Sequence, residues 1–209
     1  MSKTNKIVVV GGSFNPPTVA HKRIMEEAIQ AIGADKGIFI PSSENYVSRK
    51  MSKKTENNQV YTEEQRHKML ELLIEDSNYN IEIDDCEYGD DGRGHTYKTL
   101  KHISEKYSNS EVYSIVGTDN LAWMCRWKHK EKLFSKFNFI VITRDGDNAQ
   151  QIIENNETLS LYKDHFVIIK QPEGIENISS TLARKLINEK DKALNNILDS
   201  KVINLAYSI

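Results

Sequence analysis

The chain has 209 residues, enough for one α/β domain or for one domain with a small appendage. A formal net charge of -2 and a pI near 6.3 provide no global basic field, which argues against nucleic-acid binding. Because no apolar run reaches about 18 residues and no basic, apolar leader is present, we expect a cytoplasmic protein without a membrane segment. The two cysteines lack metal-ligand spacing, which predicts reduced thiols and no zinc site.

The first elements are a strand, a tight turn and a helix. Ile7–Val10 is a short β-branched apolar run, typical of a strand buried on both faces. Gly11-Gly12 follows, where a backbone turns tightly or approaches a ligand. Pro16 and Pro17 then disfavour helical dihedral angles in the residue before each proline. A helix is expected to begin near Thr18. Apolar residues recur there at helical spacing, namely Ile24, Met25, Ala28, Ile29 and Ile32.

This strand–turn–helix segment predicts an anion site. With Thr18 as the N-cap, His21 lies one turn further on the same side of the helix. Backbone N–H groups of Gly11, Gly12 and Ser13 and of the helix start, a hydroxyl and an imidazole then point at one spot beyond the strand. The spacing of glycine and lysine fits neither a Walker loop nor a dinucleotide GxGxxG motif. The sequence therefore predicts phosphate binding, with His21 as a cation or a hydrogen-bond donor.

A second strand is expected at Gly37–Ile40, followed by a long polar stretch over residues 41–60. We expect that stretch to be a loop, and a structureless loop of about 20 residues inside a compact domain is uncommon and is often functional. Two interpretations remain open for it, a solvated surface loop and a lid whose lysine reaches a phosphate. Its basic residues are Arg49, Lys50, Lys53 and Lys54.

Helices and strands alternate through the rest of the chain. The expected elements are a helix at Thr62–Asp76, an edge strand at Asn80–Glu87, a loop at Asp90–Gly94, a helix at Thr96–Tyr107, a strand at Glu111–Val116, a short helix, a helical piece at Lys130–Ser135, a strand at Phe137–Thr143, a helix or loop at Asn148–Asn156, a strand at Phe166–Ile169 and a helix from Ile178 through Ile187. This rhythm predicts an α/β class with a doubly wound parallel sheet. We expect a single domain over residues 1–209, with 178–209 as a C-terminal helical subregion.

In such sheets, ligands bind beyond the carboxyl ends of the strands, and two further segments are expected there. Hydroxyls of Ser179 and Ser180 at a helix start, with Arg184 four residues further on, offer donors to one anion. The alternative is an ordinary serine cap with a solvated arginine. Asp119, just past a strand, either binds a ribose hydroxyl or a metal or caps the next helix. Trp127 either stacks on a planar ring or belongs to the core.

These motifs resemble a known family. GGSFNPPTVAH, residues 11–21, resembles the (H/T)xGH signature of the nucleotidyltransferase superfamily, and Ile178–Arg184 resembles its ISSTxxR motif. The resemblance covers about residues 6–187. Between the two ends, the stretches that resemble bacterial nicotinate-mononucleotide adenylyltransferases are His95–Tyr97 with Thr99 and Leu100, Val116–Asp119 with Trp127, and Thr143–Gly146.

The resemblance implies a Rossmann-like nucleotidyltransferase fold. It also implies adenylyl transfer from ATP to nicotinate mononucleotide, giving deamido-NAD and pyrophosphate in NAD biosynthesis, without a covalent intermediate. His21 and Thr18 are then the catalytic pair, Ser179, Ser180 and Arg184 hold the leaving phosphates, and Mg²⁺ is carried by the ATP phosphates. The other implied nucleotide contacts are Gly11, Gly12, Ser13, Phe14, Gly117, Asp119 and Ile178. The implied contacts to the acceptor are Lys50, Thr96, Tyr97, Trp127 and Arg144.

The signature departs from the family's usual form at two positions. Thr18 stands where HxGH has its first histidine, and Ala20 stands where it has glycine. A threonine there resembles phosphopantetheine adenylyltransferase, so that activity stays open as an alternative. A cytidylyltransferase for an alcohol phosphate and a nucleotide-binding module without turnover are further alternatives. The acid or amide form of the mononucleotide acceptor and the oligomeric state are left open.

Overall fold

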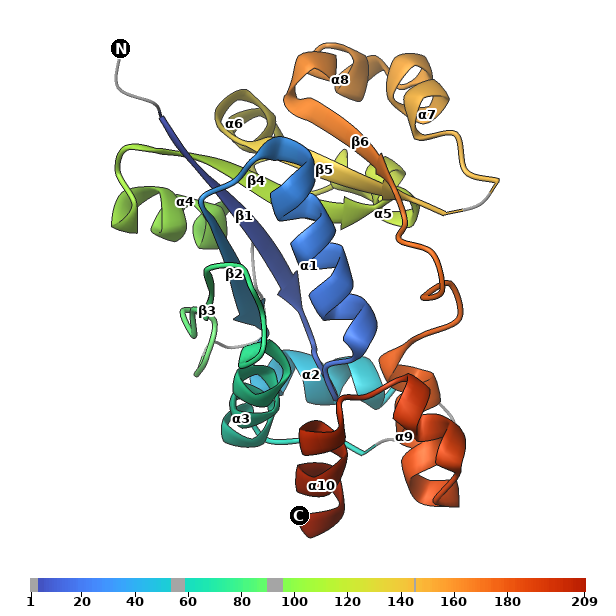
Figure 1. The fold of residues 1–209 in the computed structure, drawn as a ribbon. Coiled ribbons are helices and arrows are strands. Elements are labelled where there is room, and N and C mark those ends of the chain that lie inside the picture. The colour runs from blue at the N-terminus through green and yellow to red at the C-terminus, as the bar shows by residue number, and fades with distance from the viewer. Residues whose placement is uncertain (1–3, 54–58, 90–95, 145) are drawn as a thin grey trace. The chain divides into compact units, whose positions relative to one another are not determined.

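The computed structural model of the protein describes residues 4–53, 59–89, 96–144 and 146–209 (Figure 1). Predictions for Lys54, His95 and Asp145 and for the loop Asp90–Gly94 fall outside these residues. The elements in chain order are β1 (Asn5–Gly12), α1 (Val19–Ile32), β2 (Lys36–Pro41), α2 (Glu44–Met51), α3 (Glu63–Ile74), β3 (Ile81–Ile83), α4 (Thr96–Lys106), β4 (Ser110–Gly117), α5 (Thr118–Met124), α6 (Lys130–Lys136), β5 (Asn138–Thr143), α7 (Ala149–Asn155), α8 (Glu157–Ser160), the 3₁₀ turn η1 (Lys163–His165), β6 (Phe166–Lys170), α9 (Ser180–Glu189), the 3₁₀ turn η2 (Lys192–Asn196) and α10 (Ser200–Ser208).

The six strands form one sheet in the order β3-β2-β1-β4-β5-β6. Strands β1 and β4, β4 and β5, and β5 and β6 pair in parallel, with Ile7 opposite Val112 and Ile140 opposite Val167. The chain moves outward from β1 in one direction and from β4 in the other, so the strand order reverses between them. This confirms the predicted doubly wound α/β fold, and β3 is the expected edge strand.

The chain divides into two compact units, each built from three separate segments. Unit 1 comprises Met1–Val10, Ile24–Ile38 and His95–Glu173, and unit 2 comprises Gly11–Arg23, Phe39–Gly94 and Gly174–Ile209. The expectation of a single domain with a C-terminal helical subregion stays a prediction.

Unit 1 has an aromatic core over its strands. Phe134 of α6 contacts Phe139 of β5 edge-on, with ring centroids 5.7 Å apart, and Phe139 stacks on Phe166 of β6 at 5.4 Å. Apolar residues on successive positions of β5 are buried, as expected for a strand covered on both faces. The apolar run that predicted β5 therefore corresponds to a strand buried in the sheet.

Unit 2 corrects the prediction that residues 41–60 form a loop throughout, because Glu44–Met51 form helix α2. The Ser43 Oγ accepts a hydrogen bond from the Tyr46 N–H and so caps the helix. Only Val47 and Met51 of the helix are buried, one turn apart. Two apolar residues give too weak a period to be distinguished in the sequence, although their spacing and the preceding serine do suit a short helix.

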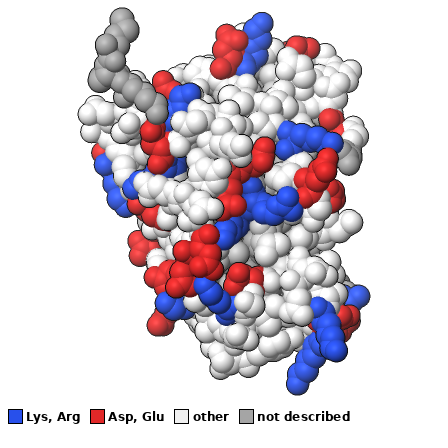
Figure 2. Space-filling view, in the orientation of Figure 1, with Lys and Arg blue, Asp and Glu red and all other residues white. Residues whose placement is uncertain are grey.

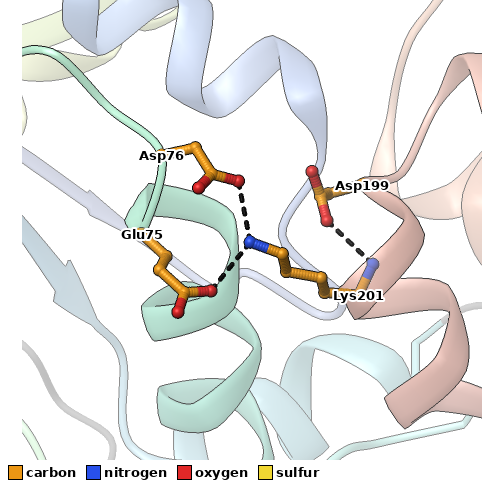
Figure 3. Close-up of polar contacts among 4 residues, drawn as sticks. All are labelled: Glu75, Asp76, Asp199 and Lys201. Carbon is orange, nitrogen blue, oxygen red and sulfur yellow. Dashed lines mark hydrogen bonds and ion pairs between the residues drawn. The ribbon is translucent and has the colours of Figure 1, made fainter.

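Helix α3, also in unit 2, begins with a capping box, within the range predicted for this helix. The Thr62 hydroxyl accepts from the Gln65 N–H, and the Gln65 side chain accepts from the Thr62 N–H. At the other end of α3, Lys201 of α10 reaches Glu75 and Asp76, with N–O distances of 2.8 and 2.7 Å (Figure 3). The Asp199 carboxylate caps α10 by accepting from the Lys201 N–H. These contacts tie the C-terminal helix to α3.

The surface carries charges of both signs. On the face shown in Figure 2, acidic and basic side chains are interspersed and no extended field of one sign is present. Among the described residues, no helix is both long and apolar enough to cross a membrane.

Candidate active site

The segment after β1 has a backbone shaped by two aromatic contacts. A Cβ on Gly12 would lie 2.9 Å from the Phe14 ring, so a side chain there would require the buried ring to shift. Phe14 has a positive φ of 42°, a conformation that is costly for a bulky residue. Its buried ring meets the rings of His21 and Phe39 edge-on, at centroid distances of 5.1 and 5.3 Å. Phe14 therefore packs against the imidazole and helps to hold its plane.

His21 is oriented by the helix start that carries it. It is the third residue of α1, and its Nδ1 lies 2.9 Å from the backbone nitrogen of Thr18, which can only donate. This is half of a capping box, with an imidazole in place of the usual glutamate or glutamine. The buried Thr18 hydroxyl lies 2.8 Å from the same nitrogen. Because Nδ1 must accept, the neutral ring carries its proton on Nε2.

The protonation state of His21 follows from its surroundings. Burial lowers its pKa from 6.5 to about 4, and the nearby positive charge of Lys50 adds to the lowering. At neutral pH, the imidazole is therefore uncharged and acts as a hydrogen-bond donor through Nε2. Of the two roles expected for His21, the structure favours the donor over the cation.

Helix α9 lies against the loop after β1, residues 13–18. The sequence predicted that these two segments, which are far apart in the chain, lie close together. The Ser180 hydroxyl donates to the Pro16 carbonyl at 2.8 Å, and the Arg184 Nη1 donates to the Asn15 carbonyl at 2.6 Å. Ser179 is the N-cap of α9, and its Oγ accepts from the Leu182 N–H. In this structure, the donors of Ser180 and Arg184 thus bind loop carbonyls.

Arg184 is not the solvated arginine that the alternative interpretation required. Its side chain is 1 % exposed, and burial lowers its pKa. Further donations run from Nη1 to the Ser180 carbonyl at 3.2 Å and from Nη2 to the Thr181 hydroxyl at 3.4 Å. Direct contact of Ser179, Ser180 or Arg184 with a phosphate stays a prediction, as does contact of Ile178, which is half-buried just before the cap.

Two N–H groups expected to face an anion at the start of α1 donate to other acceptors. The Val19 N–H donates to the Ile197 carbonyl at 3.0 Å, and the Thr18 N–H donates to His21. The prediction that the N–H groups at the helix start all point at an anion is therefore wrong for these two positions. The C-terminal segment caps the helix instead, a long-range contact that local sequence does not reveal.

Lys50 and Ser13 meet beside this loop. Lys50 lies on α2, and its Nζ donates to the Ser13 Oγ at 3.2 Å. Ser13 is half-buried and Gly11 is exposed, so both are placed at the surface of unit 2. The helix thus brings a lysine to the predicted phosphate-binding turn, although residues 44–51 are not the loop that was expected.

Two buried polar residues that the sequence analysis did not single out hold the loop in place. The Asn15 Oδ1 accepts from the Tyr61 N–H at 2.9 Å, and its Nδ2 donates to the Gln59 carbonyl at 2.8 Å. Arg66, on α3, is fully buried and donates to the Ser13 carbonyl. The sequence does contain a pattern that indicates a buried Arg66. At helical spacing, it shares a helix face with the core residues Met69, Leu70 and Leu73.

The remaining predicted residues belong to unit 1. Gly117 is the N-cap position of α5, Asp119 lies exposed in its first turn, and Trp127 is half-buried after it. Tyr97, in the first turn of α4, contacts the rings of His129 and Phe137 at 5.5 and 6.3 Å. That these residues, with Thr96 and Arg144, face the same nucleotide as the residues of unit 2 stays a prediction.

Comparison with known proteins places the chain in a family. A family model described as Cytidylyltransferase-like matches residues 9–186. The chain belongs to this family. A probable nicotinate-nucleotide adenylyltransferase from Clostridium acetobutylicum is 31 % identical over 186 residues, which are 89 % of this chain and 88 % of the relative. One from Clostridium novyi is 29 % identical over 184 residues, 88 % of each chain. The resemblance seen in the sequence motifs is thereby confirmed.

Solved structures of nicotinate-nucleotide adenylyltransferases share the fold. The Plasmodium falciparum nicotinic acid mononucleotide adenylyltransferase complexed with NaAD has a TM-score of 0.73 at 21 % identity. The match covers 98 % of this chain and 95 % of that one. A putative nicotinate-nucleotide adenylyltransferase from Vibrio parahaemolyticus has a TM-score of 0.65 at 20 % identity, with 97 % and 99 % coverage. These likenesses confirm the Rossmann-like nucleotidyltransferase fold.

Proposed function

We propose that this nucleotidyltransferase transfers the adenylyl group of ATP to nicotinate mononucleotide, forming deamido-NAD and releasing pyrophosphate in NAD biosynthesis. The observation that carries the proposal is the 31 % identity over nearly the whole chain to a relative named for this activity. The arrangement around His21 supports it, because it presents a fixed donor of the kind that adenylyl transfer needs.

The reaction requires positioning and neutralisation of charge rather than a covalent intermediate. An oxygen of the acceptor's 5′-phosphate attacks the α-phosphorus of ATP and forms the new P–O bond. The bond between the α-phosphorus and the bridging oxygen breaks, and pyrophosphate leaves with that electron pair. His21 Nε2–H donates to an oxygen on the α-phosphorus as negative charge develops there, and Thr18 fixes the ring that carries this proton.

The side chains of unit 2 suit anionic oxygens. Lys50 supplies a positive charge beside Ser13. The helix start at Ser179 and Ser180, with Arg184, supports the leaving phosphates, partly by holding the carbonyls of Asn15 and Pro16. Lys50 and Arg184 are cations without a lone pair to offer a metal, so Mg²⁺ would be carried by the ATP phosphates and would neutralise part of their charge there.

The acceptor and the wider nucleotide site are assigned to residues of unit 1. Thr96 and Tyr97 approach the nicotinate carboxylate, Trp127 stacks on its ring, and Arg144 lies near the mononucleotide. The resemblance further implies nucleotide contacts at Gly117 and Asp119 in unit 1 and at Gly11, Gly12, Ser13, Phe14 and Ile178 in unit 2. We expect the protein to act in the cytoplasm.

An acceptor panel tests the proposal. The protein is supplied with ATP and Mg²⁺ and with each of nicotinate mononucleotide, nicotinamide mononucleotide, phosphopantetheine and an alcohol phosphate, and pyrophosphate is followed. We expect the highest kcat/KM with nicotinate mononucleotide. Turnover only with another acceptor assigns a different nucleotidyltransferase activity. ATP binding without pyrophosphate from any acceptor assigns a binding module.

A further inference from the structure

Arg66 connects three segments of unit 2 through one buried guanidinium. Its Nε donates to the Tyr61 carbonyl at 3.2 Å, its Nη1 to the Ser13 carbonyl at 3.0 Å and its Nη2 to the Ser42 carbonyl at 2.6 Å. The side chain is 0 % exposed. A planar fork with donors in fixed directions is needed to satisfy three carbonyls at once, and a lysine ammonium on a flexible stem does not reproduce that geometry.

Burying the Arg66 guanidinium costs desolvation free energy. We infer that the side chain fixes the backbone geometry of its three partners rather than adding stability. Its charge is balanced by the three carbonyls, by the Tyr88 ring 5.8 Å from Cζ and by the negative charges of Glu63 and Glu44. Burial lowers the pKa of Arg66, as expected for a cation removed from water. A buried charge of this kind is weak evidence for stability, since an apolar side chain of similar volume avoids the desolvation cost.

The bonds from Arg66 to these carbonyls orient the Ser13–Phe14 peptide and fix the start of helix α2. Because the C=O and N–H of a trans peptide point in opposite directions, holding the Ser13 carbonyl inward turns the Phe14 N–H away from Arg66. Ser42 immediately precedes the N-cap of α2, so the Ser42 bond fixes where that helix begins. Helix α2 in turn carries Lys50, whose Nζ reaches the Ser13 Oγ. Arg66 therefore holds both ends of the Lys50–Ser13 contact.

We propose that Arg66 is a positioning residue for the ATP phosphates, holding the Ser13–Phe14 peptide and the Lys50 helix in register. This inference rests on the proposed function, because it assigns the loop after β1 and Lys50 to ATP. Arg66 touches neither substrate nor reacting atoms. It acts through Ser13 and α2, so its loss weakens ATP binding and leaves binding of the acceptor unchanged.

The test compares Arg66→Lys and Arg66→Met with wild type. The dissociation constant of Mg·ATP is measured by calorimetry, and kcat and the KM values for ATP and nicotinate mononucleotide are measured by pyrophosphate release. Arg66→Lys keeps the positive charge but loses the planar guanidinium. We expect it to raise the dissociation constant and the KM for ATP about tenfold, while the KM for nicotinate mononucleotide stays within about twofold. Leu73→Val, a buried change in the same helix, is the control, and we expect it to lower stability without changing ATP binding.

A double-mutant cycle with Lys50→Met separates positioning from general destabilisation. If Arg66 acts through the Lys50–Ser13 contact, its effect on ATP binding shrinks once Lys50 is removed. Fully multiplicative effects, an unchanged ATP constant in Arg66→Lys, or an equal loss in Leu73→Val would each overturn the proposal. If Arg66→Met does not fold, Arg66→Lys decides. If wild type binds ATP but forms no pyrophosphate with any acceptor, the proposed function fails, while the comparison of ATP affinities still decides the role of Arg66.

Discussion

His21 shows how a contact that belongs to helix capping selects one tautomer of an imidazole. The Thr18 N–H requires an acceptor, the imidazole at the third helical position supplies Nδ1, and Nε2 is left as the donor. The motif in the sequence identified the residue and its surroundings. The choice between a donor and a cation needed the structure, because it depends on burial and on the charge of Lys50, which lies on a helix that the sequence did not predict.

Removing the His21 donor tests its role in the chemical step. We expect His21→Ala to lower kcat by about 10²–10³, the scale of losing one donor to a transition-state oxygen. The fold should persist, because the side chain is replaced by a good helix former near the helix start. Steady-state kinetics with circular dichroism measures both, and kcat equal to that of wild type would remove His21 from the mechanism.

The lowered pKa of His21 predicts a pH-dependent contribution to stability. In the unfolded chain, this histidine titrates near its ordinary value of 6.5, whereas in the folded protein its pKa is about 4. Between these values, the unfolded state binds a proton that the folded state does not, so this contribution is complete above pH 6.5 and is lost as pH falls towards 4.

Urea unfolding of wild type and His21→Gln measures this contribution by difference. From neutral pH down to pH 4, the unfolding free energy of wild type should fall further than that of the variant, by up to about 3 kcal/mol. Parallel pH profiles for the two proteins would show that the imidazole titrates normally in the folded state.

At the scale of elements, the strongly periodic segments were predicted well and α2 was not. Helix α3 has a capping box and a repeating apolar stripe, and it lies within the predicted range. In helix α2, only Val47 and Met51 are buried. The other residues are mostly polar, as in a loop, so the sequence shows no clear helical period. What fixes α2 is its serine cap and the bond from Arg66 to the Ser42 carbonyl, which comes from a segment 24 residues away.

Loss of the serine cap tests how α2 is held. We expect Ser43→Ala to lower the unfolding free energy by about 1 kcal/mol, because the Tyr46 N–H loses its acceptor. Ser48→Ala, the same change at an exposed position of α2, is the control and should have little effect. Denaturant unfolding compares the two, and equal midpoints would contradict a stabilising cap.

Arg184 holds helix α9 to the loop after β1. Truncating the Arg184 side chain should therefore affect both ATP binding and the free energy of unfolding. Arg184→Ala leaves the buried Asn15 carbonyl without this donor, at a cost of about 1–3 kcal/mol. We expect the KM for ATP to rise with little change in the acceptor KM. Kinetics and urea unfolding of the same preparation measure the two effects. An unchanged ATP KM together with lower stability would make Arg184 a structural residue only.

At the scale of the whole molecule, the alternation of strands and helices predicted the fold class and the motifs predicted the family. Both are confirmed by the strand order and by the relatives. Contacts made over long sequence separations could not be predicted, such as the bond from Val19 to the Ile197 carbonyl and the ion pair of Lys201 with Glu75 and Asp76. Nothing in the local sequence of either partner specifies them, because each depends on how segments pack.

We expect the adenylyl group of ATP, and no other part of it, to be transferred to nicotinate mononucleotide. ATP labelled at the α-phosphorus or at the γ-phosphorus is incubated with the protein, Mg²⁺ and nicotinate mononucleotide, and the products are separated by chromatography. We predict that the α label appears in deamido-NAD and the γ label in pyrophosphate. Label from the γ-phosphorus in the nucleotide product, or no labelled dinucleotide while ATP remains bound, would contradict the account.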